Sequence, residues 1–367
     1  MRFPSRLVSS AVAVLLLAVG AVGAEEPAAP GSGAQNEAQT QTGDEDRLTL
    51  PFAPEVGGRT QYSIVKTKQR VDGERLERDL KTTSDAELTL LSRNDQGYIY
   101  RFVISETEAS APGSSKPRLD RLLSRLAGVT TNIPLIYQAD ETGAPLHLIN
   151  TQEVRQAFRG MLVELQAMVR QLNREGVVSE AERPGLEASV KGTLGALASL
   201  SDEELGAVVL EEVGLLFTAT GGDFLVGARE SFEDHTTVPL VRRPIRVSGQ
   251  RLIKSVDRDT QIAVVEIESA YDREELQAAV AQVTSRLTGE GAPENGDVGP
   301  EETENGAAPA PSPGPSIRAL GKFEVRERSL HMIDLRSGEP LGLRHQRTLA
   351  FGDKTVVEVT KIRRVRR

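Results

Sequence analysis

The chain has 367 residues, a formal net charge of -9, five tyrosines, nine phenylalanines, and neither tryptophan nor cysteine. An acidic chain repels phosphate backbones, and so few aromatic side chains offer few stacking platforms, which argues against general nucleic-acid binding. The lack of cysteine excludes disulfides, thiolate metal sites, a cysteine nucleophile and the lipobox cysteine of a lipoprotein.

Residues 1–24 are predicted to be a secretory signal peptide. Arg2 and Arg6 precede an uninterrupted apolar run from Ala11 to Ala24, which is shorter than the roughly 20 residues that a spanning helix needs. The run ends on small residues and an acidic polar stretch follows, so we expect cleavage after Ala24. A permanent membrane anchor is the alternative. Cleavage predicts a soluble periplasmic or extracellular protein, not a lipoprotein, with no transmembrane span.

Composition and pattern divide the rest of the chain. The predicted parts are a disordered tether (25–48), a β-rich first half (49–150), a helical subdomain (151–222) and a β-rich second half (236–367) that holds a helix (273–288) and a disordered acidic loop (289–316). The tether and the loop lack the branched aliphatic and aromatic content that would offset the entropy of ordering. The loop could serve as an acidic docking strip, although such segments are usually only solvated.

Alternation with a period of two predicts the strands. In 60–70, it places Tyr62, Ile64 and Lys66 on one face. An Asn-Asp-Gln-Gly turn at 94–97 is typical of a hairpin between two further strands. The predicted strand segments are 60–70, 76–93, 97–107, 133–148 as a hairpin, 238–255, 261–269 and the stretch from 317 to the C-terminus.

Apolar residues three or four apart predict the helices. One stripe runs through 153–172, and Ser201 with Glu204 forms a capping-box pattern that opens a second helix ending before Gly221. Asp272 with Glu275 caps a third helix, and weaker helical patterns lie at 119–127 and after residue 184. Strand runs interrupted by a helical block, without strict β/α alternation, indicate an α+β fold with an antiparallel sheet and a helical insertion.

A seven-residue pattern occurs twice. Residues 142–148 and 337–343 both read [ST]-G-x-P-L-x-L, and Asp140 and Asp334 stand just before them to start a turn. Both segments are predicted to be the same hairpin used twice.

With these hairpins and long strands, the exported chain resembles the lipoprotein-localisation-factor-like half-barrels and related uncharacterised periplasmic families. The resemblance covers 60–148 and 238–364, whereas the helical block and the acidic loop depart from it. It implies a curved, half-barrel-like antiparallel sheet packed against helices. It also implies a non-catalytic concave apolar surface for a lipid or a lipidated partner.

No set of residues predicts catalysis, a metal or a cofactor. The histidines at 147, 235, 331 and 345 lack metal-ligand spacing and are expected in turns, loops or sheet surfaces. His345 lies among arginines and could touch an anion, but a solvated strand face is expected. Ser63 and Lys66 match S-x-x-K, yet on a strand they point to opposite faces. The acidic pairs 140–141 and 211–212 are expected to face solvent.

The C-terminus concentrates positive charge in an acidic chain. Its five bases are candidates for contact with an anionic surface: Lys361, Arg363, Arg364, Arg366 and Arg367. The alternative is an edge strand whose charges discourage edge-to-edge pairing.

Three functions compete. The first is an envelope carrier that binds a lipid or another hydrophobic ligand between sheet and helices. The second is a structural or interaction protein of the envelope, whose concavity is filled by its own helices and whose helical block meets a protein partner. The third, a hydrolase, lacks a recognisable nucleophile, base or metal cluster.

Overall fold

The computed structural model describes residues 47–73, 75–110, 131–174, 200–238, 243–288, 323–352 and 354–365. The predicted signal peptide with its cleavage site, almost all of the predicted tether, the acidic loop 289–316 and the weak helices at 119–127 and after residue 184 lie outside these residues. The tether prediction ran to residue 48, whereas the first described strand, β1, begins at Arg47.

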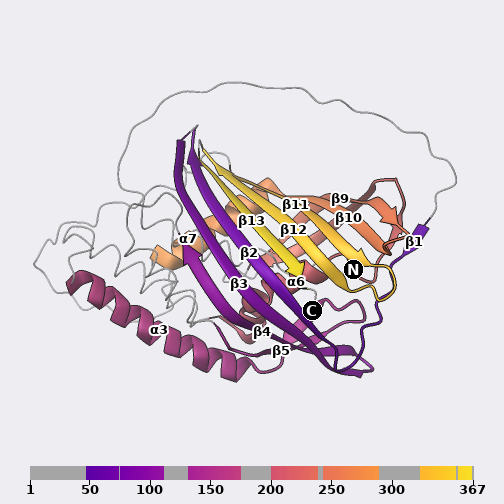
Figure 1. The fold of residues 1–367 in the computed structure, drawn as a ribbon. Coiled ribbons are helices and arrows are strands. Elements are labelled where there is room, and N and C mark those ends of the chain that lie inside the picture. Colours follow the sequence, from indigo (N-terminus) through magenta and orange to yellow (C-terminus); the bar gives the residue numbers. More distant parts are fainter. Residues whose placement is uncertain are drawn as a thin grey trace, which may run out of the picture.

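One large antiparallel sheet dominates the described residues and confirms the α+β prediction (Figure 1). It has 11 strands in the order β6-β5-β4-β3-β2-β13-β12-β11-β10-β9-β8. Their bounds are β2 Arg59–Asp72, β3 Arg75–Asn94, β4 Gly97–Ser110, β5 Leu135–Ala139, β6 Pro145–Leu148, β8 Glu230–Val238, β9 Arg243–Asp257, β10 Ile262–Tyr271, β11 Phe323–Asp334, β12 Pro340–Phe351 and β13 Lys354–Arg364.

The two β-rich halves join through the pairing of β2 with β13. Lys354 lies opposite Asp72 at one end of this pair, and Arg364 lies opposite Tyr62 at the other. The C-terminal strand is therefore internal to the sheet, and its interpretation as an edge strand is wrong. Alternation along a strand predicts which side chains share a face, but it does not predict which strand pairs beside it. The local pattern therefore could not predict this pairing.

Both copies of the repeated pattern form a hairpin turn, but the prediction of identical turns is wrong, because the glycine N–H bonds back three residues in the first copy and four in the second. Gly143 and Gly338 both adopt positive φ, at 85° and 71°. The Gly143 N–H donates to the carbonyl of Asp140, and the Gly338 N–H donates to that of Asp334, at 3.1 and 2.7 Å. The first turn joins β5 to β6, and the second joins β11 to β12.

Three short or polar strands were not predicted from the sequence. Strands β1 (Arg47–Thr49) and β7 (Asp223–Leu225) pair as a small second sheet. The strand predicted over 238–255 is in fact β9 preceded by β8. Strand β8 lies at the edge of the large sheet, where its acidic sequence meets solvent and shows little apolar alternation.

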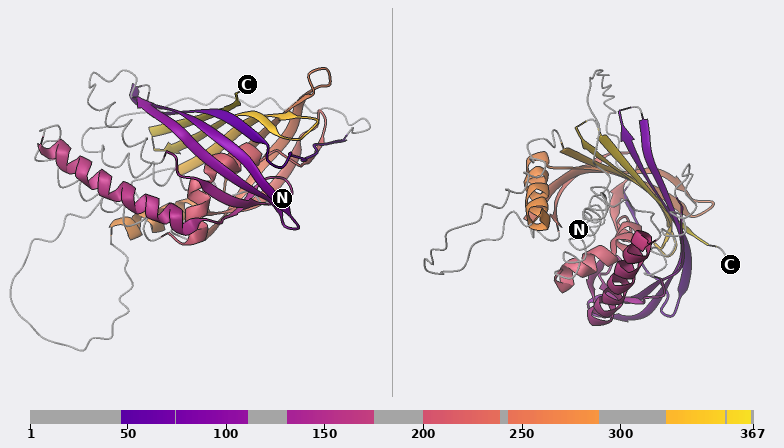
Figure 2. Two further views of the ribbon diagram at one scale, coloured as in Figure 1. Left: turned by 60° about the horizontal axis from the view of Figure 1, so that its bottom comes forward. Right: turned by 90° about the vertical axis from the view of Figure 1, so that its left-hand side faces the viewer.

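Within the described residues, four helices lie on the concave side of the sheet, which curves around them (Figure 2). They are α3 (Thr151–Arg174), α5 (Asp202–Val209), α6 (Glu211–Phe217) and α7 (Arg273–Thr288). The single helix predicted after Ser201 is two, because the chain departs from helical geometry at Leu210 (φ -99°, ψ 11°). Among the described helices, none combines the length and apolar composition needed to cross a membrane.

Two apolar clusters hold these helices against the sheet. Under α5 and α6, Leu205, Val213 and Phe217 pack with Tyr62 and Ile64 of β2. Under α7, Leu276 and Ala279 pack with residues of β11, β12 and β13 that include Val325, Leu349 and Val356. A third cluster lies over β9, β10 and the end of β11. The half of the concave face beneath α5 and α6 is therefore filled by the protein's own side chains.

Candidate binding site

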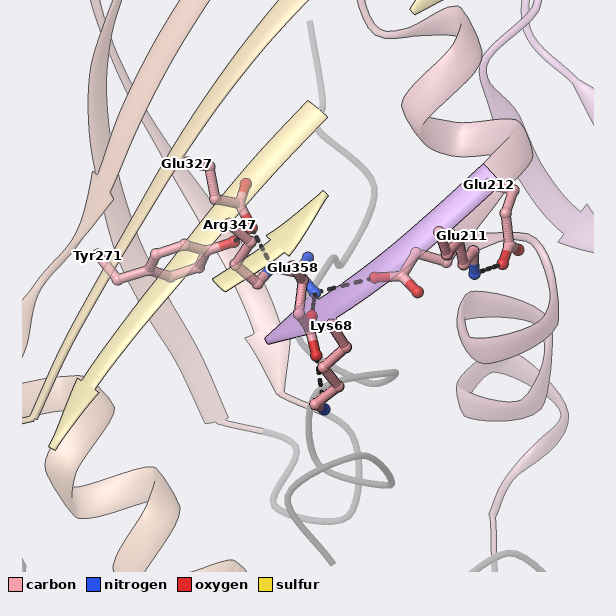
Figure 3. A network of polar contacts seen from close by, with 8 residues as sticks. Lys68, Glu211, Glu212, Tyr271, Glu327, Arg347 and Glu358 are labelled. Atoms are coloured by element: carbon pink, nitrogen blue, oxygen red, sulfur yellow. Dashed lines mark hydrogen bonds and ion pairs between the residues drawn. The ribbon is translucent and has the colours of Figure 1, made fainter. Parts of the chain in front are cut away.

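A group of charged side chains from the strands and from α6 comes together on the concave side of the sheet (Figure 3). Alternation that buries apolar side chains on β2, β11, β12 and β13 directs these charges inward as well. We call this set the charged belt: Lys66 and Lys68 of β2, Glu327 of β11, Arg347 of β12 and Glu358 of β13, together with Glu211 and Glu212 of α6.

Arg347 occupies the centre of the charged belt, with only 3% of its side chain exposed. Its guanidinium lies 2.7 Å from Glu327, 3.1 Å from Glu211 and 3.7 Å from Glu358. The hydroxyl of Tyr271 donates to the same Glu327 oxygen at 3.0 Å. Each buried charge thus has a partner of opposite sign, which is the condition for burying it.

The two lysines form the more open end of the charged belt. Lys68 lies 2.6 Å from Glu358 with 18% of its side chain exposed. Lys66 pairs with Glu212 at the start of α6, and 38% of its side chain is exposed. Two glutamates on consecutive positions of α6 therefore bind two different strands of the sheet, and they fix the orientation of the helix over it.

The pairs reinforce the ionised state of the belt. Burial opposes the charge of Lys66, but the carboxylates of Glu212 and Glu211 outweigh it and raise the pKa of this lysine. Burial likewise opposes ionisation of Glu358, yet Lys68 and Arg347 hold the pKa of that carboxyl below its usual value. The pKa of Arg347 is raised by its glutamates in spite of its burial. The ion pairs thus favour the charged form of Lys66, Glu358 and Arg347.

A cavity of about 170 Å³ opens beside the lysines. Most residues of the charged belt form one part of its wall, and threonines of β2, β3 and β13 form another. Leu80 of β3 and Leu215 of α6 supply apolar surface. The space is therefore lined by cations, carboxylates and apolar surface together.

Two histidines predicted on solvated surfaces are buried instead. His345 is 3% exposed and faces the cavity, and His331 is 1% exposed with its Nε2 2.9 Å from the hydroxyl of Ser329. The prediction failed because the local sequence around His345 is polar, whereas the alternate positions Leu343 and Leu349 on its own face are buried. His147 and His235 are exposed, as expected.

The acidic pair of α6 was also assigned wrongly to solvent. The side chains of Glu211 and Glu212 are 8% and 15% exposed and face the sheet. A usable signal was present in the sequence: β11 reads Val325-x-Glu327-x-Ser-x-His-x-Ile333, with polar residues in phase with apolar ones at both ends. Such a pattern indicates inward polar groups that need partners from a covering element.

The bases predicted to contact an anionic surface do not lie together. Lys361 and Arg363 are exposed on the convex face of β13. Arg364 points to the other face and pairs with Glu339 at 3.1 Å. Arg366 and Arg367 lie outside the described residues. Contact of these bases with an anionic surface stays a prediction.

In the described part of the chain, no group of three or more histidines, aspartates and glutamates is arranged to hold a metal ion. Lys66 and Ser63, the S-x-x-K pair, lie on opposite faces of β2 as its strand geometry predicts. What the charged belt offers chemically is two partly exposed lysine ammonium groups, each already paired with a glutamate.

No protein-family model matches the sequence. A solved chain of lipovitellin, described for its lipid–protein interactions, is similar over 85% of this chain, with 9% identity and a TM-score of 0.38. The match covers 25% of that chain, so this protein spans about a quarter of its length. A likeness of this size identifies no family.

Proposed function

We propose that the protein is an exported, non-catalytic binding module of the cell envelope. In this proposal the concave cavity receives the anionic headgroup of a lipid or of a lipidated partner. The observation that carries it is the cavity itself, where two partly exposed lysines meet apolar wall from Leu80 and Leu215. The signal-peptide pattern supports export, and the lack of a nucleophile motif supports a non-catalytic role.

The size of the cavity restricts the ligand. Pockets that enclose a drug-sized molecule have volumes of roughly 300–1,000 Å³. The cavity beside Lys68 has about 170 Å³, which suits a headgroup rather than a whole lipid. Since the apolar clusters fill the face on either side, an acyl chain would lie outside this cavity. The proposed ligand is therefore bound by its polar end.

The test is binding of a fluorescent fatty acid, compared with a zwitterionic amphiphile of the same chain length. We expect preference for the anion, and Lys68→Met should weaken its binding by roughly tenfold, because a charge-assisted hydrogen bond is lost. Lys354→Met is the matched control, because Lys354 pairs with Asp72 at the far end of β13. Equal binding by both variants, or no binding by the wild type, would contradict the proposal.

The second candidate, an interaction protein, is favoured by a different observation. Helix α3 extends beyond the sheet (Figures 1 and 2), with Val154 fully buried near its start and Val163 64% exposed. Crosslinking in envelope extracts separates the two candidates. A protein partner that Val163→Asp abolishes, in a protein that carries no amphiphile in native mass spectrometry, would favour the interaction role.

A further inference from the structure

The convex face of the sheet carries a group of cations on two neighbouring strands. Arg344 of β12 lies directly opposite Lys361 of β13, and Arg363 lies two residues further along β13 on the same face. All three side chains are exposed. Together with Met332 of β11 and Val365, we call this set the convex patch.

Like charges directly opposite each other across two strands destabilise a sheet. Within the described residues, none of the three cations takes part in an ion pair or a side-chain hydrogen bond. On the neighbouring strands of the same face the arrangement differs, since Lys254 and Arg328 both pair with Glu266. Positive charge is thus left uncompensated at the convex patch, in a chain whose formal net charge is -9.

Apolar side chains adjoin these cations. Gly342 lies opposite Arg363, and its missing side chain leaves room for Met332, whose Cε lies 2.7 Å from where a Cβ would stand. Met332 is 41% exposed and Val365 is 45% exposed. Both are on the convex side, so large apolar groups and cations face solvent together.

We propose that the convex patch docks the protein on the surface of an anionic lipid bilayer. Uncompensated cations attract anionic headgroups, and exposed apolar side chains among them insert at the headgroup boundary. The bilayer is favoured over a nucleic acid because no aromatic side chain of the described convex patch offers a stacking surface. This surface is separate from the concave cavity, so the inference does not rest on the function proposed above.

The experiment is co-sedimentation of the purified protein with vesicles of phosphatidylglycerol and phosphatidylcholine, compared with phosphatidylcholine alone. We expect binding to the anionic vesicles only, with loss at high salt. The triple variant Arg344→Gln/Lys361→Gln/Arg363→Gln should reduce the bound fraction by roughly tenfold or more. It should fold at least as well as the wild type, because it removes like-charge contacts, and circular dichroism checks this.

The matched control removes the same number of charges elsewhere. Arg229, Arg258 and Arg273 are exposed and lie outside the convex patch, so their joint replacement by glutamine should leave vesicle binding within about twofold of the wild type. Equal loss in the two triple variants, or binding that ignores lipid charge, overturns the proposal. The proposal is also overturned if the convex patch binds an acidic protein instead of the vesicles. Lys68→Met should not change vesicle binding, which keeps this result independent of the cavity.

Discussion

At the scale of single residues, the interior polar groups depend on partners that the sequence does not place beside them. The partners of Arg347 come from β11, β13 and α6, at sequence separations of 20 for Glu327 and 136 for Glu211. Alternation in β12 predicts that this arginine lies on the face of Leu343 and Leu349. It does not predict which carboxylates surround it, because these approach through tertiary pairing.

The charge of Arg347 is a strong candidate for a stability test. Arg347→Met leaves Glu327, which is 2% exposed at its side chain, buried without its cation. We expect the free energy of unfolding to fall by about 3–5 kcal/mol, measured by urea denaturation. Arg326→Met is the control and should cost less than about 1 kcal/mol, because that side chain is 72% exposed.

A second variant distinguishes loss of charge balance from loss of packing. In Arg347→Met/Glu327→Gln, the glutamine oxygen can still accept from Tyr271, and the uncompensated charge of Glu327 is gone. Much of the lost stability should return. If the double variant is as unstable as Arg347→Met, the charge of Glu327 does not account for the loss, which then comes from packing or from the charge of Glu211.

At the scale of elements, local signals predicted well wherever local chemistry decides the structure. The Ser201 hydroxyl accepts from the Glu204 N–H at 3.2 Å, and the Glu204 carboxylate accepts from the Ser201 N–H at 2.7 Å. The turn at 94–97, the cap at Asp272 and the bounds of α7 also agree with the sequence. The failures were β8 and the break at Leu210, where edge position and tertiary packing override local preference.

The capping box of α5 yields a prediction for this helix. Ser201→Ala removes the side-chain acceptor of an eight-residue helix, and we expect the free energy of unfolding to fall by about 1 kcal/mol. Urea denaturation measures the change. Ser231→Ala, at an exposed position of β8, is the control and should change stability by less than about 0.5 kcal/mol. A loss as large in the control would show that the cap contributes nothing of its own.

At the scale of the whole molecule, the sheet order is the feature that local patterns could not supply. The sequence predicted a first half and a second half, but the pairing of β2 with β13 makes them one surface. That pairing also determines where the C-terminal bases lie. Because β13 is internal to the sheet, alternation places the side chains of Lys361 and Arg363 on its convex face. Arg364 points to the other face, where it meets Glu339.

Ionisation of the tyrosines can be used to test whether this sheet and its core stay folded. All five are buried, and Tyr62, Tyr100 and Tyr137 belong to one cluster that spans β2, β4 and β5. Burial, with the neighbouring Glu339 carboxylate as a smaller cause for Tyr62 and Tyr100, raises the pKa of these phenols. In the folded protein they therefore stay protonated where an unfolded chain ionises.

The sign of the pH effect follows from this difference. Above pH about 10, the unfolded state loses phenolic protons that the folded state keeps, so stability falls as pH rises, by about 1.4 kcal/mol per pH unit for each tyrosine. We expect tyrosinate absorbance from Tyr62, Tyr100 and Tyr137 to appear only together with the loss of circular dichroism. The chain in strong denaturant is the control, where all five should titrate near pH 10. Ionisation of these three near pH 10 with an intact sheet would contradict a closed core.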